Sequence, residues 1–287
     1  MSNYQEIRYA SADGLELYAR DYSHPQPKAT ILCMPGLTRN SADFDFICRR
    51  LNKHYRLIAV DQRGRGHSEY DPNPENYLPA TYIGDMLGLL DHLGIADVLL
   101  LGTSLGGLMA MAMVSLQPER FSGYILNDIG PQIEAAGLGR IQAYVGEPEL
   151  ASSWEDAVVK SKAVHGGELL ALSDKDWLAF CRAIYRQRED GQLELAYDPA
   201  IAEPMKRIPE QPVELDVWSH FTAMADKPAL VIRGSHSDIL SLECLQKMRD
   251  IKPALEFCSV AERGHAPLLN EPEAVQAIEG FLTENFG

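Results

Sequence analysis

The feature that most constrains the fold is a repeated alternation of short apolar runs with segments of helical periodicity. Four apolar runs occupy residues 29–34, 57–60, 98–101 and 124–126, and helical patterns separate them. Runs of this length and composition are typical of strands buried on both faces, and strands that alternate with helices form a parallel sheet wound by crossovers. The sequence therefore predicts an α/β fold, preceded by a hairpin whose turn is Asp13-Gly14.

A long segment interrupts this alternation. Runs rich in Val and Ile disappear after Pro131 and return only at residues 229–232, and the segment between them carries helical patterns that begin with Ser-x-x-Asp capping spacings. We expect a core whose first part is residues 1–130, a helical cap insertion at 131–225, and the second part of the core at 226–287.

The sequence Gly-Thr-Ser-Leu-Gly at residues 102–106 is the strongest chemical signal. It lies directly after the apolar run 98–101 and directly before an apolar helical segment. A nucleophile on such a strand-to-helix turn sits in a strained backbone conformation, and small residues two before and two after it let the strand and helix pass closely. Ser104 is therefore the candidate nucleophile.

Serine needs a base, and the base needs a third group to orient it. This motif class has the order Ser, Asp or Glu, His. We assign His265 as the base and Asp238 as the acid, because both lie in loops after strand-like runs. Asp128 also follows a strand-like run and is the alternative acid.

An oxyanion formed at Ser104 needs two N–H donors. The residue after the nucleophile, Leu105, should supply one of them. The loop after the run 29–34 should supply the other, and since Pro35 has no N–H, we expect Leu37 to be that donor.

Composition narrows the class of partner. The formal net charge of −15 disfavours nucleic acid and anionic membrane surfaces as partners, which leaves a small-molecule substrate. The five cysteines are odd in number and not closely spaced, which disfavours a disulfide framework or a Cys-based metal site. The N-terminus shows no secretory signal pattern and no apolar run approaches the roughly 20 residues of a membrane span, so we expect a cytoplasmic protein. The sequence does not indicate an oligomeric state.

At these residues the chain resembles the α/β-hydrolase superfamily, and the loop Asp61–Glu69 (DQRGRGHSE) adds to the likeness. The capped members of the superfamily are the most similar: carboxylesterases, enol-lactonases and carbon–carbon bond hydrolases. The resemblance implies an eight-stranded, mostly parallel sheet with helices on both faces and a helical cap, and neither a metal nor an organic cofactor. Many members carry His-Gly where this chain has Pro35-Gly36, so the resemblance leaves the detailed oxyanion geometry open.

These residues predict a serine hydrolase that cleaves a small-molecule carboxylic ester or lactone through a Ser-Asp-His triad and an acyl-enzyme. A carbon–carbon bond hydrolase, an acyltransferase and a ligand receptor with slow turnover are the alternatives. Arg39, with Asn40 beside it, either binds a substrate carboxylate or carbonyl or forms a surface turn and helix cap. Among the aromatic residues of the insertion, we expect Trp154 and Trp218 to contact the substrate; the others considered are Tyr144, Trp177, Phe180 and Tyr185.

Overall fold

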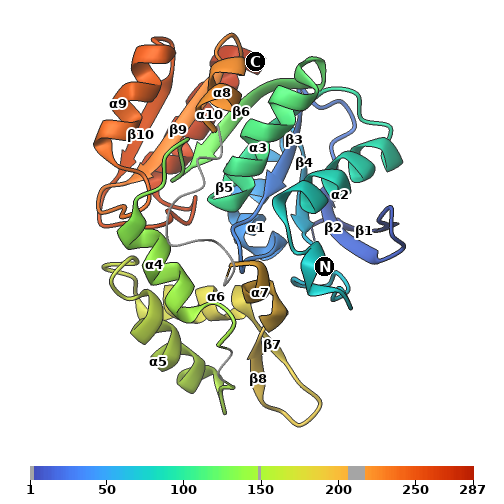
Figure 1. Ribbon diagram of the computed structural model, residues 1–287, viewed down its shortest axis with the longest axis vertical. Helices are drawn as coiled ribbons and strands as arrows, with labels where there is room; N and C mark the ends of the chain where they lie inside the picture. Colours follow the sequence, from blue (N-terminus) through green and yellow to red (C-terminus); the bar gives the residue numbers. More distant parts are fainter. Residues whose placement is uncertain (1–2, 148–149, 206–216) are drawn as a thin grey trace.

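A computed structural model describes residues 3–147, 150–205 and 217–287 of the chain. Its central strands are β1 (Gln5–Ala10), β2 (Glu16–Tyr22), β3 (Thr30–Met34), β4 (Arg56–Asp61), β5 (Val98–Thr103), β6 (Phe121–Asn127), β9 (Ala229–Gly234) and β10 (Glu256–Val260). They form one eight-stranded sheet in the order β1-β2-β4-β3-β5-β6-β9-β10 (Figure 1). The expected eight-stranded sheet is confirmed.

The strand directions place the carboxyl ends of every strand except β2 at one edge. Only β1–β2 and β2–β4 pair antiparallel, and the hairpin predicted at Asp13-Gly14 joins β1 to β2. The remaining neighbours pair in parallel, with Met34 opposite Gly102 and Thr103 opposite Asn127. Loops that follow β3, β5, β6, β9 and β10 therefore meet at the same edge of the sheet, where ligand sites in such sheets lie.

Five helices cover the two faces of the sheet: α1 (Asp45–Leu51), α2 (Pro79–His92), α3 (Leu105–Leu116), α9 (Leu242–Ile251) and α10 (Pro272–Phe286). Neighbouring residues of β5 point to opposite sides, because Leu100 packs with α2, α3 and α9, whereas Leu99 packs with α1 and α10. Both faces of the strand are thus buried, which explains why the central strands are apolar throughout rather than alternating.

Short 3₁₀ turns complete the core and the insertion: η1 (Ser41–Phe44), η2 (Pro74–Asn76), η3 (Pro118–Arg120) and η4 (Pro199–Ile201). The insertion between β6 and β9 carries α4 (Ala135–Tyr144), α5 (Trp154–His165), α6 (Asp174–Ile184), β7 (Tyr185–Gln187), β8 (Leu193–Leu195), α7 (Ala202–Met205) and α8 (Val217–Ala223). Residues 148–149 and 206–216 of the expected cap lie outside the described residues.

The insertion has its own small core. Trp177, Phe180 and Cys181 of α6 share one buried face, as the helical spacing predicted, and Ser173 and Asp176 form the predicted capping box. The β7–β8 hairpin was not predicted. Its strands are three residues each, too short to show an alternating pattern, and Glu194 of β8 stabilises them through ion pairs with Arg186 and Arg188.

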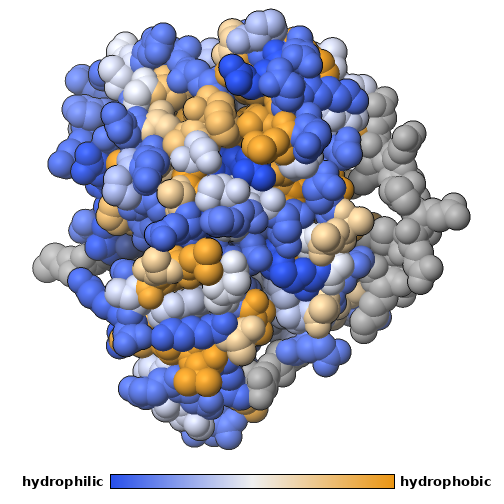
Figure 2. Space-filling model, turned by 90° about the vertical axis from the view of Figure 1, so that its left-hand side faces the viewer, coloured by the Kyte–Doolittle hydropathy of each residue, from blue (hydrophilic) through white to orange (hydrophobic). Residues whose placement is uncertain are grey.

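In space, most of the insertion lies beyond the carboxyl edge of the sheet (Figure 1), whereas α8 packs against α3 of the core through the buried Phe221. The surface in Figure 2 shows small apolar patches separated by hydrophilic side chains. None of the helices in the described ranges has the length and apolar character needed to cross a membrane.

Candidate active site

Ser104 lies at the sharp turn between β5 and α3, in the backbone conformation φ +52°, ψ −116°. The two glycines around it are required by close contacts. A Cβ at Gly102 would lie 2.4 Å from the backbone of Gly106, and a Cβ at Gly106 would lie 2.1 Å from the carbonyl oxygen of Met34. The strand and the helix therefore pass too closely for any side chain, and this holds the Ser104 hydroxyl at the carboxyl edge of the sheet.

His265, in the loop after β10, lies against this serine. Its Nε2 is 2.8 Å from Ser104 Oγ, and its Nδ1 is 2.9 Å from Asp128 Oδ2. Because an ionised carboxylate only accepts hydrogen bonds, Nδ1 carries the proton and donates to Asp128, which leaves Nε2 to accept from the serine hydroxyl. The structure thus brings together the two expected residues, Ser104 and His265, with the hydrogen-bond geometry that a general base requires.

The carboxylate beside His265 is not that of Asp238, the expected acid, but that of the alternative, Asp128. Asp128 follows β6 directly and is fully buried, with a positive φ of 56°. Besides His265, its carboxylate accepts hydrogen bonds from the Gly234 N–H at 2.8 Å and from the Ser237 hydroxyl at 2.7 Å. The Gly234 N–H holds Oδ1 and the Ser237 hydroxyl holds Oδ2, which fixes the carboxylate with Oδ2 toward the imidazole.

Asp238 instead forms a two-pronged ion pair with Arg140 of the insertion, at 2.7 and 2.8 Å. The hydrogen bond from this guanidinium lowers the pKa of Asp238. Both aspartates fit the order Ser, Asp, His, so the order could not separate them. A usable signal was present: Asp128 follows the last residue of its strand directly, whereas Asp238 lies four residues beyond Gly234, in a loop free to turn away.

The two expected oxyanion donors lie beside the serine. Leu105 is the first residue of α3, so its N–H has no acceptor within the helix. Leu37 lines the same cavity as Ser104, and its carbonyl accepts a 2.7 Å hydrogen bond from Arg65, which fixes the loop. A Cβ built on the neighbouring Gly36 would lie 3.6 Å from the Cβ of Ser104, so the loop and the serine are in close proximity.

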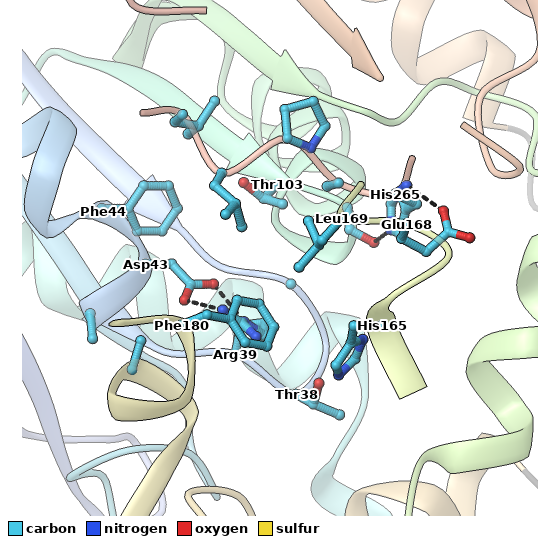
Figure 3. A pocket seen from close by; sticks show the side chains of 18 of the residues that line it. Thr38, Arg39, Asp43, Phe44, Thr103, His165, Glu168, Leu169, Phe180 and His265 are labelled. Carbon is cyan, nitrogen blue, oxygen red and sulfur yellow. Dashed lines mark hydrogen bonds and ion pairs between the residues drawn. The ribbon is translucent and has the colours of Figure 1, made fainter. Parts of the chain in front are cut away.

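The serine opens into a cavity of about 310 Å³ between the core and the insertion. Arg39 lines it, and Asp43 holds the guanidinium by two hydrogen bonds of 2.6 and 2.7 Å (Figure 3). Asn40 lies outward of the cavity: its side chain caps the turn η1 and donates to the Ala183 carbonyl. Arg39 therefore lies in the cavity, where a substrate can reach it, and Asn40 forms the expected cap.

Neither Trp154 nor Trp218, the two expected substrate contacts, lines this cavity; both pack elsewhere. Trp154 packs on the small core of the insertion with Arg182 over its ring, and Trp218 packs on the main core with the Lys247 ammonium 3.9 Å from its ring centre. The insertion supplies other side chains to the cavity, and its aromatic ones are Tyr144 and Phe180.

The insertion also forms hydrogen bonds with the loop that carries His265. Glu168, just after α5, accepts the His265 N–H on Oε2 at 2.8 Å and the Gly264 N–H on its main-chain carbonyl at 2.7 Å (Figure 3). A Cβ at Gly264 would overlap the Glu168 carboxylate, so the glycine is required for this contact. Arg140 links Glu168, at 3.5 Å, to Asp238. Neither contact was predicted, because the local sequence around Glu168 and Arg140 carries no signal for one.

The side chains of Ser104, His265 and Asp128 are arranged for nucleophilic chemistry. Within the described ranges, no group of three His, Cys, Asp or Glu side chains is placed to hold a metal ion. The arrangement supplies a hydroxyl with a neutral imidazole at its proton and a buried carboxylate behind that imidazole, which is the minimum set for attack on a carbonyl carbon.

Comparisons with known proteins point to one fold family. A family model described as the alpha/beta hydrolase fold matches residues 29–272. A 3-hydroxybutyrate-oligomer hydrolase of Cupriavidus necator is 29% identical over 96% of each chain. A 2-(acetamidomethylene)succinate hydrolase of Mesorhizobium japonicum is 27% identical over 88% of this chain and 87% of that one. The solved structure of an alpha/beta hydrolase from Novosphingobium aromaticivorans has a TM-score of 0.93 and 36% identity, and covers 99% of both chains.

Proposed function

The chain belongs to the α/β-hydrolase family and is a hydrolase, and from this premise we propose that it cleaves a carboxylic ester of a small molecule through an acyl-enzyme on Ser104. The observation that carries the proposal is the hydrogen-bonded series Ser104, His265, Asp128, with its hydroxyl at a cavity of about 310 Å³. A cavity of this size suits a small organic substrate.

The proposed reaction has two halves. In the first, Nε2 of His265 takes the Ser104 proton as Oγ attacks the ester carbonyl, and Asp128 stabilises the imidazolium that forms. The N–H groups of Leu37 and Leu105 bind the oxyanion. His265 then protonates the leaving alcohol. In the second half, His265 takes a proton from water as the water oxygen attacks the acyl-enzyme. His265 then returns this proton to Ser104 Oγ as the bond to the acyl group breaks and the acid leaves.

The insertion, proposed as a cap at residues 131–225, closes the cavity on the side away from the sheet. Ile141, Tyr144 and Phe180 face the cavity from it. A cover of this kind excludes water from the acyl-enzyme except for the attacking molecule, and its side chains choose among esters without taking part in the bond changes.

The substrate class is proposed from chemistry and from one relative. Among the curated relatives, the protein named for 3-hydroxybutyrate oligomers aligns over 96% of both chains. Units of a hydroxy acid are joined by ester bonds, which the geometry of Ser104 and His265 suits. We propose short esters of hydroxy acids as the first substrates to test, with lactones next.

The test is a panel of substrates read by burst kinetics. Chromogenic esters should give a rapid burst of one alcohol per Ser104, followed by slower turnover, because the acyl-enzyme accumulates. Adding a competing alcohol shows whether water or another acceptor takes the acyl group, which separates a hydrolase from an acyltransferase. Cleavage of a carbon–carbon or amide bond with no turnover of any ester would contradict the proposal, and binding without turnover would indicate a receptor.

A further inference from the structure

A second, smaller cavity of about 90 Å³ lies next to the first one, deeper in the insertion. Four residues line both cavities: Thr38, Arg39, Tyr144 and His165. We refer to these four as the polar belt. Figure 3 shows three of its members, Thr38, Arg39 and His165, across the pocket from Thr103 and His265. A substrate longer than the first cavity would have to pass this belt to reach the second.

His165 is the least explained member of the belt. Its ring is held edge-on between Tyr144 and Phe180, with centroids 5.4 Å from each. Among the described residues, neither ring nitrogen has a hydrogen-bond partner. Burial, together with the positive charges of Arg39 and Arg140, lowers the pKa of His165 to about 3. The ring is therefore neutral near pH 7 and offers one N–H donor and one nitrogen acceptor.

Arg39 is held rigidly but is not saturated. Asp43 occupies its Nε and Nη2, and the guanidinium stacks on Phe180 at 4.3 Å. Nη1 has no partner in the part of the chain that the structure describes. Because Arg39 is already ion-paired with Asp43 and the His165 ring is neutral, the free donors of the belt suit a neutral oxygen such as a hydroxyl or a carbonyl.

We infer that the polar belt binds an oxygen of the substrate chain, and that the enzyme prefers linear esters that carry a second oxygen function, a hydroxyl or a further ester, a few atoms from the scissile carbonyl. This inference rests on the proposed esterase function. A plain alkyl chain in the same place would displace water from Arg39 and His165 and leave their N–H groups unpaired. Leaving these donors unpaired costs more binding free energy than one neutral hydrogen bond contributes. The enzyme therefore discriminates in favour of substrates that carry the oxygen.

The experiment compares two chromogenic esters of equal chain length, p-nitrophenyl butyrate and p-nitrophenyl 3-hydroxybutyrate. The wild type should favour the hydroxy ester by about 10- to 100-fold in kcat/KM. His165→Phe keeps the ring between Tyr144 and Phe180 but removes both polar atoms, so the preference should fall to about threefold or less while turnover of the butyrate persists. His165→Gln, which retains a donor and an acceptor, should keep part of the preference.

Trp154→Phe is the matched control, because Trp154 lies outside both cavities, and it should keep the full preference. If His165→Phe fails to fold, as judged by circular dichroism and thermal unfolding, Arg39→Met decides, since it removes Nη1 and keeps an apolar stem on Phe180. Equal turnover of the two esters by the wild type, or an undiminished preference in the folded variants, would overturn the inference. No turnover of either ester by the wild type would instead refute the esterase function, and the inference with it.

Discussion

Two loops at the same edge of the sheet each present an aspartate, and they differ in what surrounds it. Asp128, after β6, is fully buried and accepts hydrogen bonds from His265, Ser237 and a backbone N–H. Asp238, after β9, has a side chain 28% exposed and pairs with Arg140 of the insertion. The carboxylate of Asp128, held by three donors at the end of a strand, can orient an imidazole. The carboxylate of Asp238, paired with Arg140 near the surface, joins the core to the insertion instead.

The loop after β9 nevertheless helps to position Asp128 in the loop after β6. Ser237, the neighbour of Asp238, donates its hydroxyl to Asp128, and the Gly234 N–H donates to the other oxygen. Arg140 then connects Asp238 to Glu168, which holds the backbone of His265. Asp128 therefore contacts the reacting base directly, whereas Asp238, Arg140 and Glu168 hold the loops around that base in place.

The largest effect should come from Ser104→Ala, which sets the scale for both aspartates. Without the hydroxyl no acyl-enzyme forms, and kcat for a chromogenic ester should fall on the order of 10⁶-fold, as for a triad serine elsewhere. A fluorophosphonate should label the wild type and not the variant, as read by intact mass. Labelling of the variant at another serine would place the nucleophile elsewhere.

Asp128→Asn should come next, with a fall in kcat of about 10⁴-fold, because the amide favours the wrong tautomer of His265. Asp238→Asn is the matched control: it makes the same change of carboxylate to amide one loop away and should retain activity within about tenfold, well short of the loss for a triad acid. Steady-state kinetics of both variants decides between the loops. The reverse result would restore Asp238 as the acid.

Glu168 should show a moderate effect through the position of His265. Glu168→Ala leaves the buried His265 N–H without its acceptor, and kcat should fall about tenfold, consistent with the cost of an unpaired buried group. Glu168→Gln keeps an acceptor oxygen and should recover most of that loss. Equal losses in both variants would mean that the charge of Glu168, rather than its hydrogen bond, is what the site requires.

The smallest effect should be that of Arg140→Met on stability. The pair with Asp238 is partly exposed, so its loss should lower the free energy of unfolding at pH 7 by about 0.5–1 kcal/mol. Arg140 lowers the pKa of Asp238 in the folded state from its ordinary 3.8, so the stabilisation is complete above that value and is lost as pH falls through the lower folded-state pKa.

Denaturant unfolding at a series of pH values tests this sign. The difference between the wild type and Arg140→Met should be constant near neutral pH and shrink in acid. A difference that grows as pH falls would contradict the ion pair. Lys247→Met, at an exposed contact with Trp218 far from both aspartates, provides a control for the loss of one positive charge.

The sequence by itself determined the parts of this protein whose requirements are local. Two glycines at fixed spacing around Ser104, between an apolar strand and an apolar helix, specify the turn. Gly102 is required by the backbone of Gly106, within five residues, whereas Gly106 is also required by Met34 of the neighbouring strand. The parallel sheet likewise follows from strands that are apolar on both faces, and the insertion from the point where such strands stop.

The tertiary structure alone decided which aspartate meets His265 and which residues line the cavity. Asp128 and His265 are 137 residues apart, and Glu168 reaches the same loop from the insertion 97 residues earlier. Trp154 and Trp218 are aromatic residues of the insertion, as Tyr144 and Phe180 are. Trp154, however, packs on the insertion's own core, and α8, which carries Trp218, packs against α3. Such choices depend on how separate segments pack, because a short sequence pattern fixes the conformation of its own backbone but not the segment that comes to lie against it.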